Sequence, residues 1–258
     1  MKARGDFMKH DRLQDMASYI RQVQSVTIEE LLRKYTISIQ TLRRDLNELE
    51  KQNIIRKVYG GVVTKEERVE RTFVLDVGLR QSVNFEQKQH IGQLAAALIE
   101  DNDIIFVDSG TTAYQLIPFI RNVTNITVIS HSLHVMNALA QLPAITAICL
   151  GGVLRKETYS FLSDTSTNQY YFNKAFISTV GLSINKGLTN TDFHEGIMKQ
   201  HIIQNADKVF ILCDSSKFGE IAFNHFADFS DVDAIITDTQ PSDIYIKFFE
   251  KNKIKVID

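Results

Sequence analysis

The sequence predicts an α/β protein with two domains, a small helical N-terminal domain and a larger domain with a mostly parallel sheet. Two observations indicate this. Between Thr27 and Lys51, two amphipathic helical runs are separated only by the short turn Tyr35-Thr36-Ile37. From Glu86 onward, continuous apolar runs of strand length alternate with helical runs. A chain of 258 residues is long enough for two such domains.

Charge is distributed unevenly along the chain, although its net charge is only −2. Residues 1–65 carry 13 Lys and Arg against 8 Asp and Glu, a balance of +5. The remaining residues carry 16 against 23, a balance of −7. A basic first domain joined to an acidic second one favours contact with nucleic acid through the first domain.

The first domain is expected to span residues 8–64 and to begin with two helices. Apolar residues at helical spacing predict the first helix, from about Asp11 to Gln24: Leu13, Met16, Ile20 and Val23. The second helix starts at Thr27, which forms a capping box with Glu30. Its apolar residues are expected to pack beneath a third helix: Ile28, Leu31 and Leu32.

The third helix is predicted over Ser38–Lys51, with the Ser38 hydroxyl capping its first turn. Four apolar side chains fall on one face: Ile39, Leu42, Leu46 and Leu49. Polar and cationic side chains point elsewhere: Gln40, Thr41, Arg43 and Arg44. Two helices joined by so short a turn, the second carrying exposed arginines, are typical of a helix-turn-helix.

A small hairpin, or wing, is predicted after the third helix. Two β-rich runs lie on either side of a Gly60-Gly61 pair, which favours a tight turn. Arg56, Lys57 and Tyr59 on this hairpin are candidates for contact with phosphates that flank a DNA groove.

The residues predicted to contact DNA lie on the third helix and the wing: Ser38, Gln40, Thr41, Arg43, Arg44, Arg56, Lys57 and Tyr59. Arg can bind a guanine edge with two hydrogen bonds, and Gln40 can bind adenine in the same way. Which arginine contacts a base and which a phosphate is left open, and arginines also occur on helix faces that are merely solvated. Asp45 would be repelled by DNA, so we expect it to hold a neighbouring arginine or a cap within the domain.

This part of the sequence resembles the DeoR family of bacterial repressors. The run Ser38-x-x-Thr41-Leu42-Arg43-Arg44-Asp45-Leu46 matches the Ser-x-x-Thr-φ-Arg-Arg-Asp-φ signature of the family's recognition helix, φ being apolar. The wing Val58-Tyr59-Gly60-Gly61-Val62 follows it. The resemblance implies a winged helix-turn-helix domain fused to a domain that senses a sugar phosphate.

Residues 65–85 are expected to be a linker, containing at most one extended piece, because they are charged and weakly periodic. The second domain, residues 86–258, begins with a helix whose apolar face runs from Ile91 to Ile99, followed by a buried strand at Ile104–Val107. Further helices are expected from about Thr112 and around Leu133–Leu142. The later strands are Ile126–Ile129, Ile145–Leu150, Ala175–Val180, Val209–Leu212, Ala234–Thr237 and Ile254–Ile257. Such runs predict a mostly parallel sheet that is covered on both faces.

Five loops that follow strands carry glycines, hydroxyls and cationic side chains. In a parallel sheet, ligands bind where strands end and loops lead into helices. The clearest loop is Asp108-Ser109-Gly110-Thr111-Thr112, where a phosphate is the favoured guest and an ordinary capped turn is the alternative. Arg155 and Lys217 could bind phosphate or sugar oxygens, but each alone is more often a surface charge. The candidate effector-binding residues are Asp108, Ser109, Gly110, Thr111, Thr112, Ser130, His131, Ser132, Gly151, Gly152, Arg155, Gly181, Asp214 and Lys217.

These loops also resemble the DeoR-family sensor domain. The matching stretches are Asp108–Thr112, Gly151-Gly152-x-x-Arg155, Asn173–Ile177, Gly187–Asp192 and Asp214–Gly219. The resemblance implies a fold like that of ribose-5-phosphate isomerases and coenzyme A transferases, and a phosphorylated sugar or polyol as effector. Ser163 and the Ser130-His131-Ser132 run depart from the commoner family pattern and are expected to tune which effector fits. The wing, Asn173–Phe176 and Gly187–Asn190 look most like members that serve inositol catabolism.

The resemblance therefore implies a cytoplasmic transcriptional regulator, a repressor of a carbohydrate or polyol operon that a phosphorylated sugar releases from double-stranded operator DNA. We expect a homo-oligomer, a dimer or tetramer, without cofactor, bound metal or membrane contact. The alternative is a sugar-phosphate isomerase-like enzyme with an added helical domain, but Val180–Ser183 lacks the carboxylate that such an enzyme needs. Asp192 with Lys217 is a conceivable substitute pair. A metal site at His194-Glu195 lacks a second histidine at the helical offset.

The two cysteines, Cys149 and Cys213, lie in apolar runs and are predicted to be reduced core residues. No apolar run reaches the ~18 residues that a membrane-spanning helix needs. The opening residues show no signal-peptide pattern, and they are compatible with a translation start at Met1 or at Met8.

Overall fold

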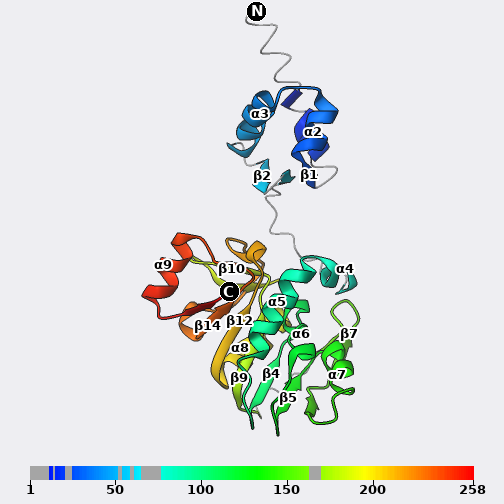
Figure 1. Cartoon of the computed structure of the whole chain (residues 1–258), viewed down its shortest axis with the longest axis vertical. Coiled ribbons are helices and arrows are strands. Elements are labelled where there is room, and N and C mark those ends of the chain that lie inside the picture. Colours follow the sequence, from blue (N-terminus) through cyan, green and yellow to red (C-terminus); the bar gives the residue numbers. More distant parts are fainter. Residues whose placement is uncertain are drawn as a thin grey trace, which may run out of the picture. The chain divides into compact units, whose positions relative to one another are not determined.

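The computed structural model describes residues 12–13, 15–20, 25–51, 54–58, 61–64, 77–162 and 170–258. The chain forms two compact units with the boundary between Arg68 and Val69. We call the described residues up to Thr64 the head and those from Val77 onward the body (Figure 1). No helix among the described residues has both the length and the apolar character to cross a membrane.

The head contains the predicted helices and wing. Residues 12–13 and 15–20 are helical, α2 spans Ile28–Tyr35 and α3 spans Ile39–Lys51. The capping box is present: the Thr27 hydroxyl accepts the Glu30 N–H at 3.2 Å, and the Glu30 carboxylate accepts the Thr27 N–H at 2.9 Å. Thr36 ends α2 in the left-handed region with φ 47°, which turns the chain sharply towards α3.

The wing is an antiparallel hairpin of β2 (Ile55–Val58) and β3 (Gly61–Thr64). A third strand, β1 (Ser25–Thr27), pairs with β3 where the sequence predicted only a break between helices. The three helices and the hairpin enclose one apolar core, which includes Leu31, Leu42 and Leu46. Ile39 was predicted on this buried face, but 43% of it is exposed because it lies in the first turn of α3.

The body is built on a seven-stranded sheet in which every neighbouring pair is parallel, in the order β15-β14-β12-β9-β4-β5-β6. Its strands correspond to the seven predicted apolar runs: β4 (Ile104–Val107), β5 (Thr127–Ser130), β6 (Thr146–Cys149), β9 (Phe172–Ser178), β12 (Ala206–Leu212), β14 (Ala234–Ile236) and β15 (Lys255–Ile257).

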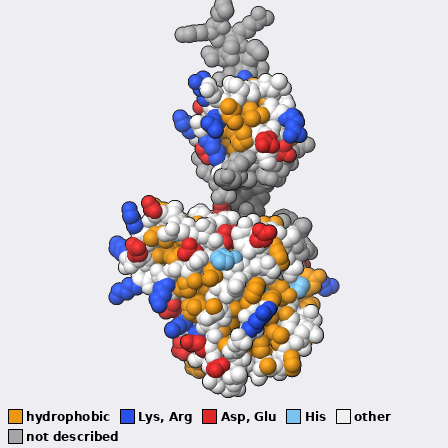
Figure 2. All heavy atoms as spheres, viewed as in Figure 1, with side chains coloured by type: hydrophobic (Ala, Val, Ile, Leu, Met, Phe, Trp, Pro, Cys, Tyr) orange, Lys and Arg blue, Asp and Glu red, His pale blue; other side chains and the backbone are white. Residues whose placement is uncertain are grey.

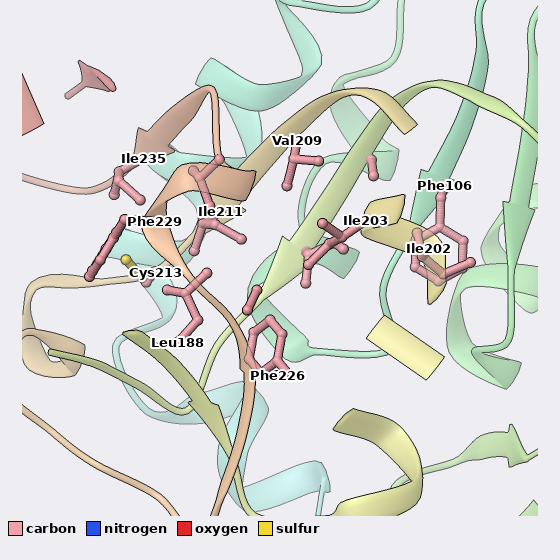
Figure 3. Packing of buried hydrophobic residues seen from close by; sticks show 14 of the residues in the cluster. Phe106, Leu188, Ile202, Ile203, Val209, Ile211, Cys213, Phe226, Phe229 and Ile235 are labelled. Carbon is pink, nitrogen blue, oxygen red and sulfur yellow. The ribbon is translucent and has the colours of Figure 1, made fainter. Parts of the chain in front are cut away.

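Both faces of the sheet are buried, since alternate residues of one strand enter two different cores. In β12, Val209 and Ile211 belong to one core, while Phe210 and Leu212 belong to the other. The first core also takes residues of α8 (Phe193–Gln204) and α9 (Asp243–Lys251), and Figure 3 shows Ile202 and Ile203 among the sheet residues. The second takes residues of α5 (Phe85–Ala96), α6 (Thr111–Tyr114) and α7 (Leu133–Leu139).

Two small sheets were not predicted. One is the hairpin of β7 (Val153–Arg155) and β8 (Ser160–Leu162). The other consists of β10 (Gly181–Ser183), β11 (Gly187–Asn190) and β13 (Asn224–Ala227), all antiparallel to their neighbours. Short 3₁₀ turns lie at Ile117–Phe119, Ser215–Lys217 and Phe229–Asp231.

The structure corrects two further predictions. The described part of the expected linker contains a helix, α4 (Val77–Ser82), rather than an extended piece. Both cysteines are free, and Cys213 is buried as predicted, but Cys149 is exposed because its strand, β6, lies at the edge of the sheet.

Candidate functional site

The exposed side of α3 carries the polar residues that the sequence selected for DNA contact. Gln40, Arg43 and Arg44 are exposed, and Thr41 is half-buried. Figure 2 shows Lys and Arg side chains gathered at the surface of the head beside hydrophobic ones. Ser38 begins the helix as predicted, because its hydroxyl accepts the Thr41 N–H at 3.2 Å.

Asp45 lies on the opposite side of α3 and is only 1% exposed. Its carboxylate accepts two hydrogen bonds from the guanidinium of Arg12, at 2.8 Å and 3.2 Å. The bond to Asp45 raises the pKa of Arg12 above its ordinary value and outweighs the opposing effect of burial. Asp45 therefore has the predicted structural role, fastening α3 to the first helix.

Of the three predicted wing residues, the structure describes the side chain of Lys57. The Lys57 ammonium contacts the Glu50 carboxylate at 2.8 Å and the Asn47 side chain, both on α3, so it joins the wing to α3. The Arg56 side chain and Tyr59 lie outside what the structure describes.

Replacing Asp45 by Asn is expected to lower the stability of the head by about 1–3 kcal/mol. Loss of one partner from a buried pair costs ~3–5 kcal/mol, and the exposed part of Arg12 reduces that cost. Amide hydrogen exchange in α3 of the full chain measures the effect. Asp15→Asn is the control, because Asp15 is exposed and bonds only the Tyr35 hydroxyl among the described contacts. Equal acceleration by both variants would contradict this role for Asp45.

In the body, the candidate loops all leave the sheet at the same end. Asp108 follows β4, Ser130-His131-Ser132 ends β5, Gly151 follows β6, Gly181 follows β9, and Asp214 follows β12. Because all these strands are parallel, their carboxyl ends lie on the same side, which we call the carboxyl edge.

A buried ion pair forms the centre of this edge. Asp108 is fully buried, and its Oδ2 lies 3.1 Å from the ammonium of Lys199 on α8, which is 4% exposed. The same oxygen accepts the Ser178 N–H at 3.1 Å, and Lys199 donates to the Ser178 carbonyl at 2.6 Å. Burial by itself would raise the pKa of Asp108, but Lys199, His131 and the Ser178 N–H together hold that pKa below its ordinary value. Asp108 is therefore a carboxylate at neutral pH.

His131 lies beside this pair with its ring stacked on Phe106, centroids 5.8 Å apart. Its Nε2 is 4.0 Å from Asp108 Oδ1, and both side chains are fully buried. Burial lowers the pKa of His131, although the nearby Asp108 and Glu195 carboxylates oppose this. Among the described residues, Asp108 Oδ1 and both ring nitrogens of His131 have no hydrogen-bond partner. Buried polar atoms of this kind ordinarily bond to something, so they indicate a polar ligand or water.

The loop Asp108–Thr112 is packed tightly against β9. A Cβ at position 110 would overlap the Ser178 side chain, so only glycine fits there. The Ser178 hydroxyl accepts the Ala113 N–H at 3.2 Å and thereby occupies one amide at the start of α6. Thr111 and Thr112 are buried, and Ser109 is half-buried. The absence of a side chain at Gly110 thus lets this loop lie close to Ser178 of β9.

The hydroxyls after β5 serve local turns. Ser130 Oγ accepts the Ser132 N–H at 3.0 Å, and Ser132 Oγ caps α7 by accepting the Val135 N–H at 3.3 Å. A second cluster of buried polar side chains lies next to them, because Ser132 forms an isolated β-bridge with Ser160. In it, the Glu195 carboxylate accepts from Asn190 Nδ2 at 3.1 Å and from the Ser160 hydroxyl at 3.5 Å.

Arg155 pairs with Asp192 at 2.6 Å. Asp192 also caps α8 by accepting the Glu195 N–H at 2.9 Å. Among the described contacts Asp192 meets Arg155 and the start of α8, and none joins it to Lys217, so the conceivable catalytic pair gains no support. Gly151 and Gly152 are exposed, and a Cβ at Gly151 would meet nothing within 4 Å.

Asp214 is 1% exposed, and its Oδ1 accepts from Asn84 Nδ2 at 3.2 Å and from the Ser216 N–H at 3.1 Å. Its Oδ2 is buried without a hydrogen-bond partner among the described residues. Lys217, at the end of the turn that follows, is half-buried. Gly181 is buried, and a Cβ there would overlap the Glu220 carbonyl.

Sequence reasoning missed Lys88, Glu195 and Lys199, although a signal for each was present. Glu195 and Lys199 are four residues apart on α8, on the face that also buries Met198 and Ile202. Lys88 shares the buried face of α5 with Ile91, Gly92 and Ala95. A charged residue in register with buried ones indicates a partner in the interior. Ser163 lies outside the described residues.

A pocket of about 360 Å³ lies elsewhere, near the amino end of β12. Its lining includes four aspartates: Asp207, Asp228, Asp231 and Asp233. These carboxylates would repel an anionic ligand, so this pocket does not suit a sugar phosphate. The described residues contain no group of three or more His, Cys, Asp or Glu side chains that could hold a metal ion.

Comparisons with known proteins match both units. Residues 12–68 match the DeoR-like helix-turn-helix domain, and residues 83–239 match the DeoR C terminal sensor domain.

The full-length relatives are regulators. The chain is 33% identical to the HTH-type transcriptional regulator IolR of Bacillus subtilis (strain 168), over 96% of this chain and 99% of the relative. It is 31% identical to the HTH-type transcriptional repressor GlcR of the same organism, over 96% of each chain. It is 30% identical to the glycerol-3-phosphate regulon repressor of Escherichia coli (strain K12), over 86% of this chain and 88% of the relative. Among solved structures, a D-ribose-5-phosphate isomerase in complex with phospho-erythronic acid is 17% identical, covering 52% of this chain and 54% of that one with a TM-score of 0.40.

Proposed function

The chain belongs to the DeoR family of transcriptional regulators, and we propose that it represses an operon for carbohydrate or polyol catabolism until a phosphorylated sugar releases it. The observation that carries this proposal is the exposed Gln40-Arg43-Arg44 side of α3, on a helix fastened from behind by Asp45 and Arg12. A rigid helix with exposed cationic and amide side chains suits readout of the major groove. Family membership also makes the chain a regulator rather than an isomerase.

The DNA contacts divide between bases and phosphates in this proposal. Arg43, Arg44 and Gln40 contact base edges or adjacent phosphates, while Ser38 and Thr41 lie at the start of the helix. Arg56, Lys57 and Tyr59 bind phosphates from the wing, which requires the Lys57 ammonium to leave Glu50 or to be shared with it. In functional terms, residues 8–64 bind DNA, residues 65–85 form a connecting segment that includes α4, and residues 86–258 form the sensor.

The effector site lies at the carboxyl edge. Asp108 Oδ1, His131 and Asp214 Oδ2 provide buried hydrogen-bonding atoms that suit the hydroxyls of a sugar or polyol. Three cationic side chains suit the phosphate of the effector: Lys88, which interacts with Asp214, and Lys217 and Arg80, which both interact with Lys88. The similarity to IolR supports the branch that serves inositol catabolism.

In this proposal the regulator acts in the cytoplasm. It is a homo-oligomer, a dimer or tetramer, because paired recognition helices match paired half-sites on a double-stranded operator. The effector prefers the form in which these helices are misplaced, so its binding lowers affinity for DNA.

Fluorescence anisotropy with DNA from the control region of the chain's own operon tests the proposal. We expect tight binding that one member of a panel of sugar and polyol phosphates abolishes. Insensitivity to the whole panel would remove the sensor from the proposal, and a thermal-shift screen with the same panel shows which compounds bind the native protein.

Replacing Lys217 by Ala is expected to leave operator binding unchanged and to weaken the effector response about tenfold or more, because a charge-assisted bond to phosphate is lost. Anisotropy titrations of the protein–DNA complex with the effector measure this. Lys247→Ala, on the exposed surface of α9, is the control and should respond like the native chain. Loss of operator binding in Lys217→Ala would show a structural role for Lys217 instead.

A further inference from the structure

Helix α4 is the first described element of the body, and residues 65–76 join it along the chain to the wing of the head. Any signal that passes along the backbone from the sensor to the head therefore passes through α4. The effector site can influence α4 only if residues of that site contact the end of this helix.

Polar side chains of α5, of Asn84 before it and of the effector loops hold the end of α4. The Lys88 ammonium donates to the carbonyl of Arg80 and, at 2.7 Å, to the carbonyl of Val83. The Thr111 hydroxyl, from the loop after β4, donates to the same Arg80 carbonyl at 3.5 Å. Asn84, in the left-handed region with φ 54°, donates its side-chain amide to Asp214 after β12 instead of capping α5.

The two apolar side chains that flank Asn84 contribute little burial. Val83 and Phe85, on either side of Asn84, are 56% and 45% exposed. The ammonium of Lys88, by contrast, is part of a side chain that is only 5% exposed. Among the described side chains at this junction, hydrogen bonds from a few donors therefore hold the end of α4 against the body.

The charges around Lys88 favour an incoming anion. Burial lowers the pKa of Lys88 to about 8, Asp214 opposes this, and Lys217 and Arg80 lower it further. Among the charged groups that act on Lys88, Lys217 and Arg80 are cationic and Asp214 is anionic. A phosphate dianion placed among them would attract the Lys88 ammonium more strongly than a neutral carbonyl does.

We propose that α4 is a latch that reports the occupancy of the effector site. A phosphate bound beside Lys217 takes the Lys88 ammonium, and with it the Thr111 hydroxyl, away from the Arg80 and Val83 carbonyls. The end of α4 is then released, and the change reaches the head through the connecting segment. This inference rests on the proposed function, because it takes the effector's phosphate to bind at the carboxyl edge.

Amide hydrogen exchange of the full chain tests the latch, with inorganic phosphate as the probe and chloride at matched ionic strength as the reference. We expect phosphate to accelerate exchange in residues 77–84 about tenfold or more while slowing it in the loop around Asp214. In Lys88→Met, which keeps an apolar stem, residues 77–84 should exchange rapidly without phosphate and show no further response. Lys247→Met, the same change at an exposed site on α9, should behave like the native chain.

Asn84→Ala provides a second variant should Lys88→Met fold poorly, and it too should accelerate exchange in α4 without phosphate. Unchanged or slower exchange of residues 77–84 in native protein at saturating phosphate overturns the latch. Failure of the latch is distinguishable from failure of the proposed function. If a sugar phosphate releases operator DNA while exchange in α4 stays constant, the regulator stands and the latch is wrong. If neither changes, both are wrong.

Discussion

Replacing Lys199 by Met is expected to lower the free energy of unfolding by about 3–5 kcal/mol at neutral pH, because it leaves the Asp108 carboxylate buried without its cation. Asp108 is fully buried and Lys199 is 4% exposed, so solvent screens the pair little. The change also removes the donor to the Ser178 carbonyl at 2.6 Å. Urea unfolding of the native and variant chains measures the difference. Lys247→Met should stay within about 0.5 kcal/mol of the native chain, as surface substitutions do.

The loss in Lys199→Met should depend on pH. In the native chain the pKa of Asp108 lies below its ordinary value, so the pair stabilises the fold above the unfolded pKa, and this stabilisation is lost as pH falls through the folded pKa. In the variant, burial is no longer opposed by Lys199 and the pKa of Asp108 rises. The difference in stability should therefore shrink as pH is lowered from 7 towards about 4. If Lys199→Met lost the same free energy of unfolding at every pH, the packing of Lys199 rather than its charge would account for the stabilisation.

Replacing Arg43 by Ala is expected to weaken operator binding by ~1–3 kcal/mol, and replacing Arg44 as well is expected to roughly double the loss. Arg43 and Arg44 are exposed on α3, whose buried face is secured by Leu42, Leu46 and Asp45. Truncation should therefore leave the head folded and remove contacts to DNA. Anisotropy titrations with operator DNA and with random DNA of equal length measure both losses.

The comparison of the two DNAs assigns the contact. Loss on operator DNA alone, with relaxed preference at one base pair, indicates that Arg43 binds a base edge. Equal loss on both DNAs would contradict base contact and assign Arg43 to a phosphate. Arg33→Ala, an exposed arginine on α2, controls for the change in net charge and should cause a smaller loss that is the same on both DNAs.

The large sheet could be predicted because each strand, such as Ile104–Val107, is apolar on both faces and is recognisable from local sequence alone. The strands β10, β11 and β13 could not, since runs such as Gly187-Leu188-Thr189-Asn190 are short and partly polar, and β11 also pairs with the distant β13. The same holds for β1, whose three residues pair with the wing about 36 positions later.

The candidate site divides in the same way. Loops that end strands could be predicted, because a parallel sheet brings their residues to one edge. Their partners could not be named, because contacts such as Lys199 with Asp108 and Lys88 with the Arg80 carbonyl depend on how α8 and α5 pack on the sheet. Periodicity places these lysines on buried faces but does not identify what they meet.

The central claim is that α3 binds operator DNA and that a phosphorylated sugar in the body controls this binding. The most direct measurement is the affinity of the full chain for the control region of its own operon at low ionic strength, with and without sugar phosphates. We expect tight binding to this DNA, weaker binding to random DNA, and release by one phosphorylated sugar or polyol. Absence of any preference for the control region, in a chain that instead converts a sugar phosphate to product, would contradict the account.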